Sequence, residues 1–415
     1  MIRAVVAPNP PDDRLTAVRA ALPALEAGIY LNTGSVGPLP AESAAAMAEL
    51  EAYELHTGRA HVDYWHETLQ RLAEARAAVA AVLTCDASDI AITHSSTDGM
   101  STAAWSIDWR PGDRAVTTSL EHPGGIGALY NLRDRVGIEL LFVDVGPERS
   151  EAEILEAFDA AIDDRTRFVA VSHVLWATGR TLPIPAIAEL AHARGAILAV
   201  DGAQAAGAIR VDVEALGADL YAISAQKWLL GPEGMGALAV PPPARDRLAP
   251  SWGGHFTFET VDSTGGARRW RNARAFETSN FHRPSIVGMA RSIGWLSMFV
   301  GLDWVYDRGA SMARLAADRL ADIDGVELVT PRDRMANLVT FRIAGWPAEA
   351  AFEELGARVF AVLRTVPLVD ALRISVAAFT SEAELERFLG AVELLAAHTP
   401  ETVPPRRTLT ILTGG

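Results

Sequence analysis

The sequence has one cysteine, Cys85, among its 415 residues. A single thiol excludes an intrachain disulfide and a metal site built from several cysteines, and it is compatible with a reducing cytoplasm. The chain also lacks any run of five or more Lys and Arg residues, and its net charge is −15. Nucleic-acid backbones and anionic membranes need a concentrated basic surface. We therefore expect neither as a partner, although an anion can still bind locally.

Long apolar runs are missing as well. No segment of the sequence reaches the ~18 uninterrupted apolar residues of a membrane span. The first residues contain Pro8, Pro10 and Pro11, unlike the apolar core of a signal peptide. The two histidines His61 and His66 do not share one helix face as metal ligands would. We expect a cytoplasmic protein without a metal site.

The composition, with 49% apolar and 21% charged residues, is typical of a globular protein. At roughly 150 residues per domain, the length allows two or three domains. From about residue 88, short β-rich runs alternate with amphipathic stretches at 151–162 and 185–194. The expected strands are 89–93, 114–119, 138–145, 167–173, 196–200, 219–224 and 236–240. This alternation predicts an α/β fold with a mostly parallel seven-stranded sheet, whose ligands bind at the carboxyl ends of the strands.

The pattern changes after Pro241. We expect loops at 241–243 and 252–266, helices at 285–301, 302–323, 348–355 and 381–397, and strands at 326–329, 337–343, 358–363 and 372–376. These predict a smaller α+β domain. The expected organisation is an N-terminal segment (1–30) packing on the small domain, a large domain (31–283), the small C-terminal domain (284–398) and a tail (399–415).

Two polar residues follow neighbouring strands of the expected sheet: Asp201 ends one strand and Lys227 follows the next. A lysine amine and a carboxylate that converge at one edge suit pyridoxal phosphate (PLP) chemistry. The amine forms a Schiff base with the aldehyde, and the carboxylate keeps the pyridinium nitrogen protonated. Either residue alone is more often a surface Lys or a helix-capping Asp.

Further segments resemble a known family, the class V aminotransferases of the fold-type-I PLP enzymes. This group contains cysteine desulfurases, isopenicillin N epimerase and cyst(e)ine C–S lyases, and the C–S lyases are the most similar. The resemblance covers about residues 28–395. It is carried by the segments Asp108-Trp109 with Gly112-Asp113, Glu121-His122-Pro123-Gly124, Ser172-His173-Val174-Leu175-Trp176 with Thr178-Gly179, and Arg364-Thr365 upstream of Arg373.

The resemblance implies a phosphate cup at Ser96 and Thr97, completed by Ser224 and Gln226. The stretch around Ser96 follows a strand and opens a helix, whose free amides and dipole favour an anion. Taken alone, it is also a common N-cap. Many relatives have His where Gln226 stands, and Gln can donate a hydrogen bond but brings no positive charge.

By the same resemblance, His122 stacks on the cofactor ring, Gln204 hydrogen-bonds its phenolic oxygen, and Thr178 lies near the ring. The implied substrate-binding residues are Asn32, Trp176, Arg364 and Arg373. A guanidinium binds a carboxylate through two parallel hydrogen bonds. Two arginines suit two carboxylates, or one carboxylate held twice. The family's Asn beside Trp176 is missing from this chain.

The segment 276–280 resembles one that reaches the phosphate of the neighbouring subunit. Asn280 aligns best with the contacting residue, and Ser279 is next. The resemblance thus implies a homodimer with shared active sites.

The resemblance leaves several reactions open. Cysteine desulfurases need a nucleophilic Cys on a loop of the C-terminal third, and this chain has no Cys after residue 85. We therefore expect a PLP-dependent C–S lyase acting on cysteine, cystine or a related conjugate. An aminotransferase and an epimerase are the alternatives. A scaffold protein without the cofactor would be expected to have lost Lys227 or Asp201, and both are present.

Overall fold

The computed structural model describes residues 13–278 and 280–406. Its largest sheet has seven strands in the order β2-β8-β7-β6-β5-β3-β4, in which only β8 runs antiparallel to its neighbours. The strands are β2 (Ile90–Thr93), β3 (Arg114–Thr118), β4 (Glu139–Val143), β5 (Thr166–Ser172), β6 (Ile197–Asp201), β7 (Leu220–Ser224) and β8 (Gly236–Ala239). Each lies at an expected position, so the predicted α/β fold with a mostly parallel seven-stranded sheet is confirmed.

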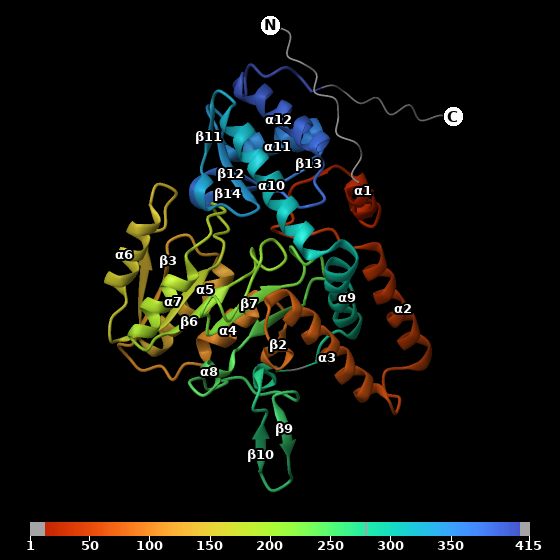
Figure 1. Cartoon of the computed structure of the whole chain (residues 1–415), viewed down its shortest axis with the longest axis vertical. Helices are drawn as coiled ribbons and strands as arrows, with labels where there is room; N and C mark the ends of the chain where they lie inside the picture. Colours follow the sequence, from red (N-terminus) through yellow and green to blue (C-terminus); the bar gives the residue numbers. More distant parts are fainter. Residues whose placement is uncertain (1–12, 279, 407–415) are drawn as a thin grey trace.

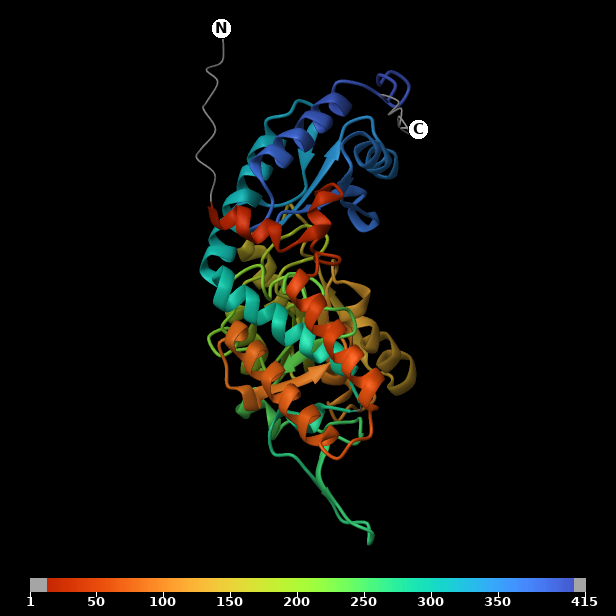
Figure 2. The ribbon, with the colours of Figure 1, turned by 90° about the vertical axis from the view of Figure 1, so that its right-hand side faces the viewer.

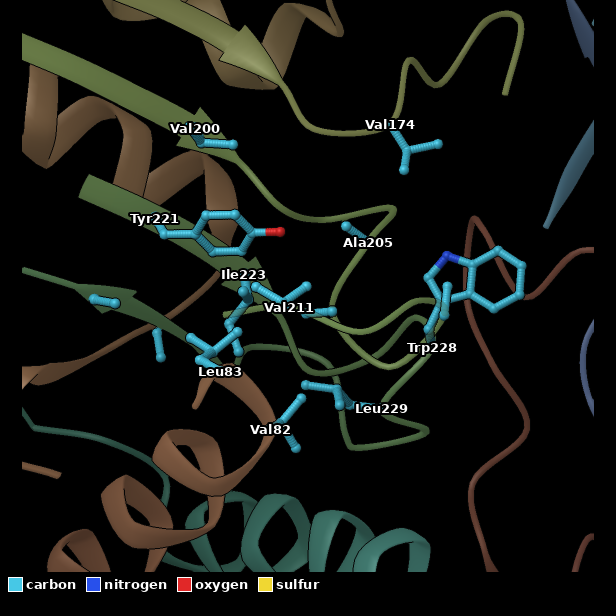
Figure 3. Packing of buried hydrophobic residues seen from close by; sticks show 14 of the residues in the cluster. Val82, Leu83, Val174, Val200, Ala205, Val211, Tyr221, Ile223, Trp228 and Leu229 are labelled. Carbon is cyan, nitrogen blue, oxygen red and sulfur yellow. The ribbon is translucent and has the colours of Figure 1, made fainter. Parts of the chain in front are cut away.

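Apolar side chains leave both faces of this sheet, because successive residues of a strand point to opposite sides. One face packs on α4 (Ser96–Trp105) and α5 (Pro123–Val136). The other packs on α3 (Tyr64–Leu83), α6 (Glu151–Ala161) and α7 (Ile184–Ala193). Figure 3 shows part of this second face, including Tyr221 and Ile223 from β7 and Leu83 from α3. The sheet is thus buried between two helix layers, as continuous apolar strands require.

A second sheet of four strands has the order β11-β12-β15-β14. The strands are β11 (Val326–Leu328), β12 (Leu338–Ile343), β14 (Arg364–Val366) and β15 (Ala371–Ser375). Its core is shared with α10 (Leu302–Ala321), α11 (Ala348–Val359) and α12 (Glu382–Ala396). In Figure 1 these elements lie above the seven-stranded sheet, and α9 (Arg283–Gly294) leads into them from below.

The N-terminal part of the described chain packs against this smaller unit. Arg19, in α1 (Asp13–Ala20), makes two hydrogen bonds of 2.7 Å to the Glu384 carboxylate of α12. The short strand β1 (Ile29–Tyr30) then pairs in parallel with β13 (Ala361–Val362). Figure 2 shows α1 beside the C-terminal elements. The chain continues through α2 (Ala41–Thr57), which lies along α9.

Four local expectations differ from the structure: two for loops, one for a strand and one for the form of a helix. The stretch 252–266 is not only loop, because β9 (Phe258–Val261) pairs with β10 (Ala267–Arg269) in a hairpin that projects from the body (Figure 1). Residues 358–363 are not one strand, since α11 runs to Val359 and ends at Phe360, whose φ is 54°. The helix expected over 285–301 changes to a π-helix at Trp295–Val300. After Pro241, residues Pro242–Arg245 form the short helix α8.

Among the described residues, no single helix is long and apolar enough to cross a membrane. The segments Arg283–Val300 and Leu302–Ala321 meet the length and composition criteria only as a pair, and the break between them bends by 84°.

Candidate active site

The carboxyl ends of β5, β6 and β7 form the floor of the candidate site. Ser172 and Asp201, the last residues of β5 and β6, are paired in register, and Asp201 is in turn opposite Ala222 of β7. Asp201 is buried, and one carboxylate oxygen accepts the Ala203 amide at 2.9 Å. A side chain at Gly125 would come within 3.0 Å of the other carboxylate oxygen. A glycine here therefore leaves that oxygen room for a ligand.

Lys227 lies in the turn after β7 and faces the same edge of the sheet. Burial lowers the pKa of its amine to about 8, an effect that Asp201 opposes and Arg373 and Arg364 reinforce. About a tenth of the amine is therefore neutral, and so nucleophilic, at pH 7, far more than for a lysine with the ordinary pKa. The turn is packed against Gly37, where an added Cβ would lie 2.3 Å from the Lys227 carbonyl oxygen.

The predicted phosphate cup lies where α4 begins. Ser95 caps this helix by accepting the Asp98 amide at 3.1 Å. The Ser224 hydroxyl lies 3.0 Å from both the amide nitrogen and the hydroxyl of Ser96, so these two cup residues meet across the sheet. The Gln226 side-chain oxygen is buried and has no hydrogen-bond partner among the described residues. Thr97 is exposed, and its hydroxyl would lie 2.4 Å from a Cβ at Gly124.

The residues expected around the cofactor ring differ in their surroundings. His122 caps α5 through a 3.1 Å hydrogen bond from the Gly124 amide, and its ring lies edge-on to Trp176. Burial, then Lys227, lowers its pKa. The Gln204 amide donates to the Gly34 carbonyl at 2.8 Å, and its oxygen accepts from Trp228 at 3.0 Å. Thr178 is fully buried, and its hydroxyl accepts the Arg180 amide at 3.3 Å.

Arg373 and Arg364 face each other on β15 and β14, where they are paired in register. Arg373 is fully buried and uses one terminal nitrogen to contact the Trp176 carbonyl at 2.8 Å. Its Nε and second terminal nitrogen have no partner among the described residues. Burial, with a smaller effect of Arg364, lowers the Arg373 pKa to about 9. A substrate carboxylate could accept two parallel hydrogen bonds from these two unpaired nitrogens.

Arg364 joins the predicted Asn32 loop to the Trp176 loop. Its guanidinium lies 5.5 Å from the centre of the Trp176 ring. A terminal nitrogen also contacts the Ser35 hydroxyl at 3.3 Å, and that hydroxyl donates to the Asn32 side chain at 2.8 Å. All four predicted substrate residues therefore lie around one region above the strand ends. Ser35, which the sequence analysis overlooked, links two of them.

Asn280 is exposed, and it makes no hydrogen bond to the cup of its own chain within the part that the structure describes. The segment before it is fixed by Glu277, a buried residue whose carboxylate binds Arg76 at 2.9 and 2.7 Å and accepts the Ile92 amide at 2.9 Å. Ser279, the other residue considered for this role, lies outside the described residues.

One buried polar residue at this edge was given no role in the sequence analysis, although it belongs to a segment that carries the resemblance. Glu121, just before His122, accepts hydrogen bonds from the Thr118 hydroxyl at 2.7 Å and the Ser172 amide at 2.9 Å. Its other carboxylate oxygen contacts the Ser172 hydroxyl. Its position three residues after the end of β3, beside a candidate histidine, was the available signal.

The residues present fit PLP. The cup offers hydroxyls, a helix N-terminus and the unpaired amide oxygen of Gln226, where an exchange of the amide's nitrogen and oxygen would present a donor instead. Lys227 and Asp201 provide the amine and carboxylate at the strand ends. Arg373 supplies unpaired buried donors at the place expected for an amino-acid carboxylate.

Comparison with known proteins agrees with this arrangement. A family model described as aminotransferase class-V matches residues 29–388. A probable cysteine desulfurase of Methanothermobacter thermautotrophicus is 28% identical over 328 residues, which cover 79% of this chain and 80% of the relative. A cysteine desulfurase of Salmonella typhimurium is 32% identical over 252 residues, or 60% of this chain and 61% of the relative.

Solved structures give the same result for the fold. The complex of a cystine C–S lyase with its product cysteine persulfide has a TM-score of 0.84 and 25% identity, covering 90% of this chain and 99% of the other. A cysteine desulfurase from Thermococcus onnurineus NA1 has a TM-score of 0.81 and 23% identity, covering 95% and 100%. With the strand-end lysine and aspartate already in place, these matches show that the chain is a PLP-dependent enzyme of the class-V aminotransferase family.

Proposed function

We propose that the protein is a PLP-dependent C–S lyase that converts cysteine, cystine or a related sulfur conjugate to pyruvate, ammonia and a thiol or perthiol. Water is the second reactant, since the ammonia and the keto oxygen arise by hydrolysis. The similarity to cysteine desulfurases and to a cystine C–S lyase supports C–S chemistry. The observation that carries the proposal is Arg373, a buried guanidinium with two unpaired nitrogens.

Each residue has a defined task in this proposal. Bound PLP supplies an electron-withdrawing ring, and Asp201 holds the proton on its nitrogen. Arg373 binds the substrate carboxylate and so orients the α-carbon toward Lys227. The neutral Lys227 amine takes the α-proton, for which a pKa of about 8 suits neutral pH. Trp176 and Arg364 form the wall against which the sulfur substituent lies.

The chain's only thiol does not suit a persulfide relay. Burial, followed by the nearby carboxylates Asp89 and Glu214, raises the pKa of Cys85 to about 12. A protonated thiol is a poor nucleophile, because the thiolate is the reactive form. Cys85 also precedes the cup strand β2, in a part of the chain that packs on the apolar cluster around α3. This favours direct release of the sulfur product over transfer to a protein cysteine.

We also propose a homodimer in which Asn280 of one subunit reaches the phosphate cup of the other. The exposure of Asn280 supports this. Exposed apolar side chains between residues 55 and 69 add support, since patches of this kind mark association surfaces; they are Leu55, Val62, Trp65 and Leu69. We propose the cytoplasm as the location, because the lone Cys85 needs no oxidising compartment.

The test is a pyruvate assay with purified, PLP-loaded protein and a panel of sulfur amino acids, each with and without an added keto acid. We expect cystine or a cysteine S-conjugate to yield pyruvate without any keto acid, and Lys227→Ala to abolish the release.

Other outcomes would identify other reactions. Turnover that stops after one equivalent until a keto acid is added would indicate an aminotransferase. Loss of optical activity without pyruvate would indicate an epimerase. Alanine formed with elemental sulfur, and no pyruvate, would overturn the argument from the missing cysteine.

A further inference from the structure

Beside Asp201, the strand ends hold a second buried carboxyl group that the proposed chemistry does not use. Glu121 is only 5% exposed. It follows β3, precedes the candidate ring-stacking residue His122, and contacts Ser172, whose register partner is Asp201. Two carboxyl groups therefore lie on either side of one strand end, both shielded from water.

The contacts of Glu121 distinguish its two oxygens. Oε1 accepts two hydrogen bonds, one from the Thr118 hydroxyl and one from the Ser172 amide. Oε2 contacts only the Ser172 hydroxyl, a group that can donate or accept. No Lys, Arg or His forms an ion pair with Glu121 in the part of the chain that the structure describes. A buried carboxylate without a cation is costly, so the neutral acid is favoured, with its proton on Oε2.

We propose that Glu121 is a positioning residue of the cofactor site, which carries its proton on Oε2, ties the ends of β3 and β5 together and thereby fixes His122. This inference rests on the proposed PLP site. The neighbouring charges are consistent with it. Burial raises the pKa of Glu121 to about 7, the hydrogen bonds from Ser172 and Thr118 oppose the rise, and Asp201 adds to it.

The other titratable groups around this edge of the sheet are expected to change protonation at other pH values than Glu121. Burial lowers the pKa of His173, which contacts the Tyr221 hydroxyl, to about 4. Lys227 titrates near 8. His122 is the group most easily confused with Glu121, although its pKa is lowered from the ordinary histidine value. A carboxylic acid has a C=O stretching band that neither an imidazole nor an amine possesses, so infrared spectroscopy separates these groups.

The experiment is an infrared pH titration of the purified protein together with the pH dependence of the absorption spectrum of its PLP-loaded form. We expect a carboxylic-acid band that is lost as the pH rises through about 7, with a matching change in the cofactor spectrum. Glu121→Gln should lack both transitions. Thr118→Val should move them to higher pH, because it removes a hydrogen bond that favours the ionised form. His122→Asn should keep the infrared transition.

A band that persists in Glu121→Gln, or a cofactor spectrum that titrates as in the unmodified protein, would overturn the proposal. If Glu121→Gln fails to fold, Thr118→Val decides alone, and unshifted transitions would also overturn it. The infrared result does not depend on C–S cleavage. If the protein releases no pyruvate but shows the carboxylic-acid transition, the proposed reaction is refuted and the role of Glu121 is not.

Discussion

Arg364 and Arg373 stand directly opposite each other on neighbouring strands, at positions where like charges destabilise a sheet. Within residues 13–278 and 280–406, Arg373 has no acidic partner and bears two buried nitrogens without hydrogen bonds. Nothing in the packing of the small sheet requires this arrangement. An incoming carboxylate relieves both costs, which is the physical reason for assigning the pair to substrate binding.

Arg373→Lys should therefore lower kcat/KM for an amino-acid substrate about 10- to 100-fold, the equivalent of about 1.5–3 kcal/mol for a charged hydrogen bond. Lysine keeps the charge but loses the two parallel hydrogen bonds. Steady-state kinetics with the best substrate of the panel would measure the effect. Arg342→Lys, on the same sheet but partly exposed, is the matched control and should change little. Equal effects of the two substitutions would contradict the assignment.

Lys227 gives a prediction with a defined pH dependence. Its lowered pKa of about 8 means that the amine is mostly charged below that pH and mostly neutral above it. Only the neutral amine attacks an aldehyde. The rate at which cofactor-free protein captures PLP, followed by absorbance, should rise with pH and level off above about 8. A rate that keeps rising toward the ordinary lysine pKa would show that the amine is not buried as described.

At the scale of elements, the phosphate cup forms where the start of a helix meets the end of a strand. The cup combines the first residues of α4 with Ser224 and Gln226 at the end of β7. All four predicted cup side chains are neutral. Phosphate binding then relies on hydroxyls, free amides and the helix dipole, which are weaker than charge-assisted hydrogen bonds.

Gln226→His should tighten PLP binding by several-fold at pH 6 and by less at pH 8, since only the protonated imidazole adds a charge-assisted bond, roughly twice as strong as a neutral one. Fluorescence titration of cofactor-free protein with PLP would provide the dissociation constants. Gln226→Ala is the companion variant, and it should weaken binding at both pH values. A gain from His that is the same at both pH values would mean that charge is not what the cup lacks.

At the scale of the whole molecule, the proposed dimer predicts how the activity of mixed dimers depends on where Asn280 acts. If Asn280 acts on the partner's cup, mixed dimers of Lys227→Ala and Asn280→Ala subunits contain one site with both changes and one intact site. If Asn280 acts within its own subunit, every site carries one change. We expect activity to appear when the two variants are unfolded together and refolded, beyond the sum of the separately refolded parents. No gain, despite mixed dimers shown by mass spectrometry, would place Asn280 outside the partner's site.

Local patterns in the sequence were sufficient for the seven strands of the large sheet, for the helices expected at 151–162 and 185–194, and for Asp201 at its strand end. A buried strand can be recognised from the sequence because it is a short run of apolar residues bounded by residues that favour turns. The hairpin β9–β10 was not predicted, because its strands are almost wholly exposed and their sequences show no alternation of apolar and polar residues. The π-helix at Trp295–Val300 is likewise a tertiary feature within an ordinary helical pattern.

The sequence by itself thus determined the α/β class, the order of the strands along the chain and the residue types for amine and carboxylate chemistry. Only the tertiary structure decided that Arg364 stands opposite Arg373, that Ser35 connects Arg364 to Asn32, and that Glu121 is buried beside Ser172. These facts depend on strand register and on contacts between distant segments. Spacing along the chain can show that two strand ends share one edge of a sheet, but it does not give the register in which strands pair or the contacts between distant loops.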